Sequence, residues 1–185
     1  MIRTCCLILI FTVAAFAQGF SSRYEMLTDY ANKVAQHIIE KIHEKDLSEA
    51  QIYTYLSSIV AYDNRIWSAT LSFSPSFFKQ DGLEDWWGAD QWKSNQSKSK
   101  KALYAPYVWR SMDNILAASD IGDVSSSFGY DYTDEKWDWW SRTLHSQKPT
   151  WTGPYNSSLT GHSMVSYSVP IEKFAVLSFN VWYNT

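Results

Sequence analysis

The segment "RIWSATLSF", residues 65–73, marks the point at which the sequence changes from a helical to an extended pattern. Apolar residues alternate with small polar residues along it, which is typical of an antiparallel strand with one buried face. The segment therefore predicts the first strand of a sheet. The side chains expected together on its buried face are Trp67, Ala69, Leu71 and Phe73, and those on the other face are Ser68, Thr70 and Ser72.

Two helices are predicted before this strand. Apolar residues between 22 and about 44 recur at spacings of three and four, which indicates one long amphipathic helix. Ser48 begins a second helix, because Gln51 follows three positions later and completes a capping box. The apolar stripe expected on the first helix consists of Leu27, Ala31, Val34, Ile38 and Ile42.

Extended patterns dominate the rest of the chain. Residues 74–100 are polar and rich in turn residues, so they are predicted as a long loop. A short helix is expected at 134–147, before Pro149. Further strands are predicted at residues 102–110, 149–155, 162–170 and 173–183, with a loop or short strand at 113–120. This order predicts one α+β domain, in which a long N-terminal helix packs on an antiparallel sheet of five to six strands.

The composition is that of a single globular domain with an excess of aromatic residues. Of 185 residues, 45% are hydrophobic and 19% are charged, which argues against disorder. Aromatic residues reach 17%, with ten tryptophans and twelve tyrosines, and such rings suit ligand pockets as well as cores. The net charge of −3 gives no indication of a nucleic-acid partner.

The N-terminus has the pattern of a secretory signal peptide. Arg3 precedes an apolar stretch from Cys5 to Ala17, and "AFA" stands before Gln18. The alternative is an N-terminal membrane anchor, although a spanning helix needs about 20 apolar residues. We therefore expect a signal peptide or anchor at 1–17 and an exported domain at 18–185, periplasmic, secreted or held at the membrane with the domain outside.

No pattern for catalysis, a metal or a cofactor is found. Both cysteines, Cys5 and Cys6, lie in the N-terminal apolar stretch, which excludes cysteine chemistry in the body of the protein. The segment "GHSMV" at 161–165 lacks the last glycine of a nucleophile elbow, and no histidine follows Ser163. The chain is therefore expected not to be an enzyme.

Four segments of the second half resemble, in order and spacing, the membrane-distal module of Cache sensor domains. They are "LYAPYVWR" (103–110), "YDYTDEKWDWW" (130–140), "KPTWTGPYNSSLTG" (148–161) and "MVSYSVPIEKFAVLSFNV" (164–181). Cache domains are extracytoplasmic sensors of bacterial chemoreceptors, histidine kinases and related receptors. The resemblance implies a PAS-like antiparallel sheet, with a small-molecule pocket between the sheet and the loops that carry the tryptophan-rich helix.

The sequence departs from the amino-acid-binding members of that family, which carry a Y-x4-R-x-W-Y pattern. Tyr132 and Trp139 match it, whereas Trp137 stands in place of the arginine and Trp140 in place of the second tyrosine. Asn180 stands where those members carry an aspartate. An indole cannot replace a bidentate guanidinium contact to a carboxylate. The usual mode of α-amino-acid binding is therefore not expected.

The resemblance implies a pocket lined mainly by aromatic side chains. Two adjacent rings cannot both face one core, so one ring of the pair 139–140 is expected at a pocket or surface. Aromatic faces attract cations and stack on flat rings, which favours a neutral or cationic ligand. The residues expected at the site are Tyr132, Trp137, Trp139, Trp140, Tyr155 and Asn180, with Trp109 and Arg110 as further candidates.

The function that follows is a non-catalytic, exported sensing module without an output domain, read by a membrane receptor or kinase. The chain would be either a stand-alone module or a truncated receptor. The alternative is a secreted carbohydrate-binding or adhesion module that uses exposed tryptophans. A sensor is expected to enclose its rings in a pocket, whereas an adhesion module is expected to expose them as a flat strip.

Overall fold

The computed structural model describes residues 24–79, 89–98, 103–157 and 162–183. The predicted signal peptide or anchor at 1–17 lies outside the described residues. Within them, no helix is long and apolar enough to cross a membrane.

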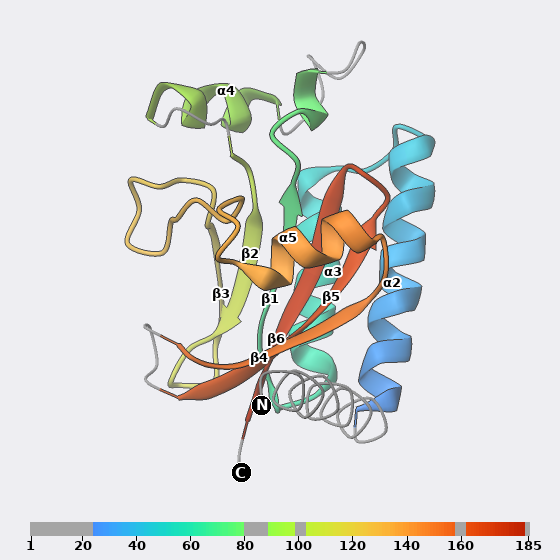
Figure 1. Cartoon of the computed structure of the whole chain (residues 1–185), viewed down its shortest axis with the longest axis vertical. Helices are drawn as coiled ribbons and strands as arrows, with labels where there is room; N and C mark the ends of the chain where they lie inside the picture. Colours follow the sequence, from blue (N-terminus) through green and yellow to red (C-terminus); the bar gives the residue numbers. More distant parts are fainter. Residues whose placement is uncertain (1–23, 80–88, 99–102, 158–161, 184–185) are drawn as a thin grey trace, which may run out of the picture.

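A six-stranded antiparallel sheet forms the centre of the molecule (Figure 1). Its strands are β1 (Ile66–Phe73), β2 (Pro106–Arg110), β3 (Leu116–Asp120), β4 (Thr150–Asn156), β5 (Ser163–Ile171) and β6 (Ala175–Trp182). Their order across the sheet is β3-β2-β1-β6-β5-β4, and every neighbouring pair is antiparallel. The predicted α+β class and strand number are confirmed.

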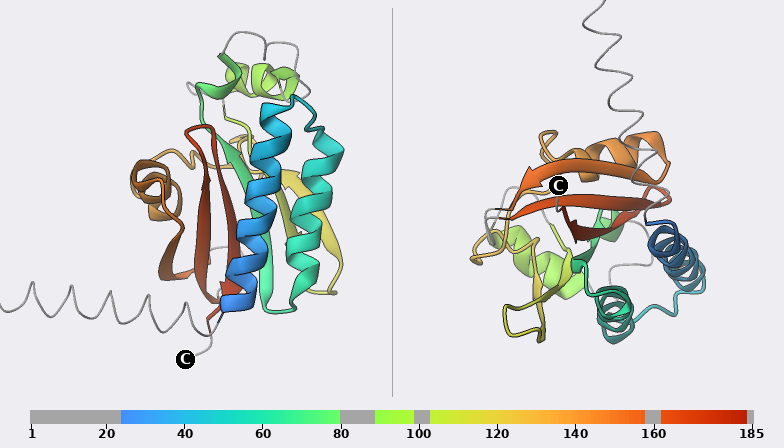
Figure 2. Two further views of the ribbon diagram at one scale, coloured as in Figure 1. Left: turned by 90° about the vertical axis from the view of Figure 1, so that its right-hand side faces the viewer. Right: turned by 90° about the horizontal axis from the view of Figure 1, so that it is seen from below.

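Helices cover the two faces of this sheet unequally. The long helix α2 (Glu25–His43) and helix α3 (Glu49–Tyr62) pack on one face, and the shorter helix α5 (Asp138–Ser146) packs on the other (Figure 2). The single turn η1 (Phe77–Lys79) and helix α4 (Ala89–Lys98) lie at one end of the molecule (Figure 1). The sheet is therefore the middle of three layers.

The predicted start of α3 is confirmed in detail. The Ser48 hydroxyl accepts a hydrogen bond from the Gln51 backbone N–H at 3.3 Å, and the Gln51 side chain accepts one from the Ser48 N–H at 2.6 Å. These two bonds satisfy backbone donors that have no partner inside the helix. The capping box therefore fixes where α3 begins.

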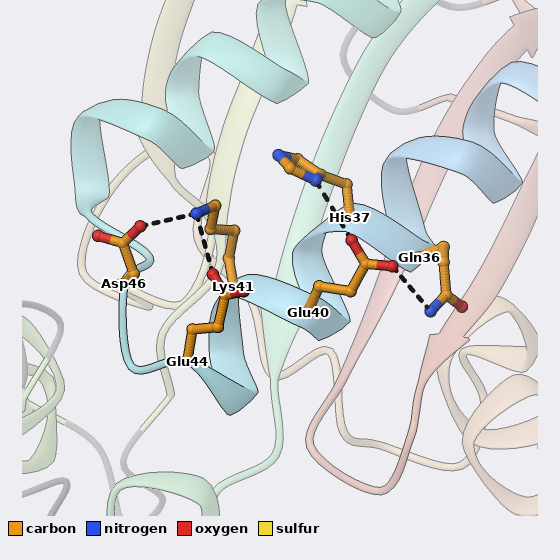
Figure 3. Close-up of polar contacts among 6 residues, drawn as sticks. All are labelled: Gln36, His37, Glu40, Lys41, Glu44 and Asp46. Carbon is orange, nitrogen blue, oxygen red and sulfur yellow. Dashed lines mark hydrogen bonds and ion pairs between the residues drawn. The ribbon is translucent and has the colours of Figure 1, made fainter.

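Exposed charges hold the end of α2 and the turn that follows it (Figure 3). The Lys41 ammonium lies 3.0 Å from a Glu44 oxygen and 2.7 Å from an Asp46 oxygen. These hydrogen bonds, chiefly the one to Asp46, raise the pKa of Lys41. Glu40 contacts His37 and Gln36 one turn earlier. This face of α2 is polar because it faces solvent, where ion pairs contribute little to stability.

Strand β1 differs from its predicted form. All eight of its residues are buried, so it has no solvated face. The register shifts between Ile66 and Ser68, and this bulge turns Trp67 to the face opposite α2 and α3. The prediction that Trp67 shares a face with Ala69 was therefore wrong. The prediction that residues 74–100 form only a loop was also wrong, because they contain η1 and α4.

The fully buried Tyr132 ties strand β1 and the segment before β2 to the segment that follows β3. Its hydroxyl donates a hydrogen bond to the Phe73 carbonyl at 2.6 Å and accepts one from the Tyr104 backbone N–H at 3.2 Å. Burial raises the pKa of Tyr132, so the hydroxyl keeps its proton. A buried hydroxyl in such a network is expected to matter for folding.

Replacing Tyr132 with phenylalanine is therefore expected to lower the free energy of unfolding by about 1–3 kcal/mol, because two buried backbone groups lose a partner. Chemical denaturation measures this change. The matched control is Tyr62→Phe, since the Tyr62 side chain is 47% exposed, and its effect is expected to stay within about 0.5 kcal/mol. Equal effects for the two variants would contradict the structural role of the Tyr132 hydroxyl.

The carboxylate of Asp120 joins α4 to the sheet. One oxygen accepts hydrogen bonds from the backbone N–H groups of Ala105 at 2.8 Å and Gly122 at 2.7 Å. The other accepts one from the Asn95 side chain at 2.8 Å. Burial raises the pKa of Asp120 above 3.8, although these hydrogen bonds oppose the shift. The ionised form is therefore less favourable in the folded protein than in the unfolded chain.

The sign of the resulting pH dependence follows from this shift. A raised folded-state pKa stabilises the fold below pH 3.8, and that contribution is lost as pH rises through the folded-state pKa. The free energy of unfolding of Asp120→Asn, relative to the wild type, should therefore increase as pH rises above 3.8 and then level off. Denaturation at a series of pH values measures it, with the exposed Asp113→Asn as control. A difference that does not change with pH would contradict the prediction.

Candidate ligand-binding site

A cavity of about 360 Å³ lies between the sheet and the layer that contains α5. The sheet supplies its floor, residues 127–130 together with Trp137 and Trp139 supply its wall, and the end of β4 supplies its rim. The volume is at the small end of the range for ligand sites. Its aromatic lining residues are Trp67, Tyr107, Phe128, Tyr130, Trp137, Trp139 and Tyr155.

The described lining of the cavity carries no charged side chain. Besides the rings it contains hydroxyl groups, the amides of Asn156 and Asn180, and a few apolar groups. A charge removed from water needs a partner of opposite sign or several hydrogen bonds. The described lining is therefore suited to an uncharged molecule or to a weakly hydrated cation that rings can surround.

A hydrogen-bond network centred on Asn180 forms the floor. The side-chain oxygen of Asn180 accepts hydrogen bonds from the Tyr155 hydroxyl at 2.8 Å and the Ser166 hydroxyl at 2.6 Å. Its amide nitrogen donates to the Ser68 hydroxyl at 2.8 Å. These contacts join four strands, so they fix the orientation of the Asn180 amide.

Three tyrosine hydroxyls converge on the cavity and remain protonated. Burial raises the pKa of Tyr107 to about 12, and it also raises the pKa values of Tyr130 and Tyr155. Tyr155 also raises the pKa values of Tyr107 and Tyr130, and Tyr107 raises that of Tyr130. The ring of Tyr155 is 36% exposed at the rim, but its hydroxyl points inward to Asn180. The cavity therefore presents neutral phenols near neutral pH.

The wall is an irregular segment held by local turns. Asp131 accepts hydrogen bonds from the backbone and hydroxyl of Thr133 at 3.0 and 2.6 Å. Asp134 accepts one from the Lys136 N–H at 3.1 Å, and this bond lowers the Asp134 pKa. A Cβ atom on Gly129 would lie 1.6 Å from the Asp123 carbonyl oxygen, so only glycine fits there. The acids beside the aromatic residues therefore shape the wall and do not line the cavity.

Four of the sequence-predicted site residues meet at the cavity: Trp137, Trp139, Tyr155 and Asn180. Trp139 lines it, whereas its neighbour Trp140 packs in the core behind the wall, in edge contact with Tyr132 at a centroid distance of 4.9 Å. The structure thus places the two adjacent rings in different environments. It does not bring Trp140 or Tyr132 into the lining.

The structure also keeps the two candidates on β2 out of the lining. Trp109 stacks on Tyr107 at a centroid distance of 5.5 Å and supports that ring from behind. The Arg110 guanidinium donates to the Asn114 side chain at 2.6 Å and to the Val60 carbonyl at the end of α3. Arg110 therefore connects a hairpin to a helix.

Sequence reasoning missed four aromatic residues of the lining: Trp67, Tyr107, Phe128 and Tyr130. Trp67 was assigned to the other face because a bulge does not show in an alternating pattern. Tyr107 could have been found, since it shares the alternation of Trp109 along β2. Tyr130 lies in the aromatic-rich stretch 130–140, which was the strongest local signal.

Three of the seven cavity rings are buried, so the lining is not a flat exposed strip. The exposed fraction is 7% for Trp67 and Tyr107 and 9% for Trp139. Tyr130 packs on Trp137 at a centroid distance of 4.8 Å. This arrangement is the one expected of a sensor pocket.

Two solved structures share this fold. The extracellular domain of soHK1S-Z6, assigned as a histidine kinase, is 22% identical with a TM-score of 0.59, and the match covers 97% of this chain and 63% of that one. The extracellular domain of mmHK1S-Z3, also assigned as a histidine kinase, is 18% identical with a TM-score of 0.51, covering 88% of this chain and 58% of that one. The chain therefore spans about three fifths of the length of these solved domains. No curated protein matches it.

A family match covers more than half of the chain. Residues 52–177, from α3 to the centre of β6, match the family described as "Methyl-accepting chemotaxis protein-like, first PDC sensor domain". This match agrees with the fold of the two solved domains and confirms the resemblance to Cache-type, PAS-like sensor domains. The chain therefore belongs to the methyl-accepting chemotaxis protein-like family of first PDC sensor domains.

Proposed function

We propose that this chain is the extracytoplasmic ligand-sensing part of a chemotaxis or histidine-kinase receptor system. It has no catalytic role and binds a neutral or weakly hydrated cationic small molecule in the cavity between the sheet and the wall. The observation that supports this proposal is the cavity with seven aromatic side chains and no charge in its described lining.

The same lining argues against a free α-amino acid as the ligand. Its carboxylate would need a cationic or multiple-donor partner, and its ammonium would need an anion or several acceptors. The described lining offers neither a cation nor an anion, and Arg110 is engaged elsewhere. An amino acid would therefore bury its carboxylate without a cation and its ammonium without an anion.

A signal would come from the coupling of two layers. The floor lies on the sheet, and the wall is the irregular segment before α5 together with the start of that helix. A ligand that contacts both favours the arrangement in which the wall is closed on the floor. A receptor or kinase partner would read that shift, while this domain itself carries out no reaction.

A thermal-shift screen of the full chain tests the proposal, since specific ligands stabilise the native state by about 2.7 kcal/mol at 100 times Kd. The expected hits are neutral ring compounds or quaternary amines, and not the twenty free amino acids. Trp137→Leu is expected to abolish the shift, because this ring lines the wall. Trp151→Leu is the matched control, since Trp151 does not line the cavity and packs against the core between the sheet and helices α2 and α3.

Two results would contradict the proposed function. A shift seen only with oligosaccharides and unchanged in Trp137→Leu would favour a secreted carbohydrate-binding module. The absence of a shift with every class of compound would argue that the cavity binds no small molecule.

A further inference from the structure

The amide of Asn180 has one hydrogen that no described residue accepts. Its oxygen already accepts two hydrogen bonds, from Tyr155 and Ser166. Its nitrogen carries two hydrogens, and one of them is donated to Ser68. The acceptor capacity of Asn180 is thus used, and one N–H remains on a residue that lines the cavity.

The hydroxyl of Tyr130 offers a second donor. Tyr130 lines the cavity, and its phenol hydroxyl carries one hydrogen that it can donate. No contact recorded among the described residues takes the hydroxyl hydrogen of Tyr130. Burial also raises the pKa of Tyr130, so this hydrogen is retained at neutral pH.

Other polar groups in the floor direct their hydrogens into the protein. The Tyr155 hydroxyl donates to Asn180, and the Thr70 hydroxyl donates to the Pro106 carbonyl at 2.9 Å. The Ser178 hydroxyl contacts the Tyr167 carbonyl at 3.3 Å and the Ser168 hydroxyl at 2.8 Å. The indole N–H of Trp137, in the wall, is buried and also has no hydrogen-bond partner within the described part of the chain. The unfilled groups identified in the floor and wall are thus donors, and a complementary ligand must bring acceptors.

We infer that the cavity selects a neutral, planar heterocycle whose ring carbonyl or ring nitrogen accepts hydrogen bonds from Tyr130 and Asn180. This inference rests on the proposed function and narrows its ligand class. A flat ring suits a small cavity with aromatic walls, because ring faces stack on one another. Acceptors at the ring edge then satisfy the donors of the floor and wall.

The unfilled donors of the cavity also disfavour a cationic ligand. A primary ammonium brings only donors and is strongly hydrated, so it would face two further donors with no anion in the described lining. A quaternary ammonium brings neither donors nor acceptors and would leave the Tyr130 and Asn180 hydrogens buried without partners, which is unfavourable. A neutral ring with acceptors avoids both costs.

Isothermal titration of the full chain with three sets of probes tests this inference. The first set is uracil, hypoxanthine and nicotinamide, the second is choline and tetramethylammonium, and the third is toluene, a flat ring without an acceptor. We expect binding within the first set only. Tyr130→Phe, which keeps the ring and removes the hydroxyl, should raise the Kd of the bound heterocycle about tenfold.

The control is Tyr62→Phe, which lies on the opposite side of the sheet and should leave the Kd unchanged. The melting temperature of each unliganded variant shows whether it is folded. Binding of choline, tetramethylammonium or toluene in place of the heterocycles, lost in Trp137→Leu, would overturn the ligand class and leave the sensing function intact. An unchanged Kd in folded Tyr130→Phe would show that Tyr130 is not the donor. If none of the probes binds, and no amino acid or sugar binds either, both the inference and the proposed function are wrong.

Discussion

The structure depends on the burial of its two central strands on both faces. Strands β1 and β6 pair with each other and lie between the helices α2 and α3 and the layer that contains α5. The face of these strands that packs on α2 and α3 is apolar and forms the larger core. The other face carries hydroxyl and amide groups, and a buried polar group is stable only when it is hydrogen-bonded. The network around Asn180 meets that requirement and at the same time creates a polar, uncharged floor.

The positions of the charges follow from the same constraint. Charged side chains form turns and ion pairs away from the cavity. Examples are the turns closed by Asp131 and Asp134 and the ion pairs of Lys41. The Asp120 carboxylate is partly buried and is surrounded by hydrogen-bond donors. These charges lie away from the cavity, and its described lining offers rings and neutral hydrogen-bonding groups.

The sequence predicted secondary structure correctly where a single periodicity or capping motif determines the conformation of a segment. The spacing of Leu27 and Ala31 predicts α2, and the Ser48–Gln51 capping box predicts the start of α3 at the correct residue. Helix α4 was missed because it has little apolar character, and its buried Asn95 is held by hydrogen bonds with groups distant in sequence. Tertiary contacts of this kind have no local signature.

The site was predictable only in part for a related reason. Family patterns and clustered aromatic residues point to Trp137 and Trp139, which line the cavity. They do not distinguish a lining ring from a supporting one, and this is why Trp109 and Trp140 appear among the candidates although they pack behind the lining. Trp67 is the opposite case, because a single bulged residue moves its ring from one face of the sheet to the other. Alternation along a strand therefore predicts burial better than it predicts the face on which a residue next to a bulge lies.

The two layers around the cavity differ in the regularity of their backbone. The floor belongs to a continuous sheet, with β6 paired along its length to β1 and β5. The wall is an irregular segment, held by contacts such as the hydrogen bond from the Tyr130 N–H to the carbonyl of Ile121, the residue after β3, at 3.0 Å. A ligand held as we propose, by Asn180 on the floor and by Tyr130 on the wall, would join the sheet to this irregular segment. Its binding free energy then favours one placement of the wall and α5 over others, and a population shift of that kind is what a partner protein can read.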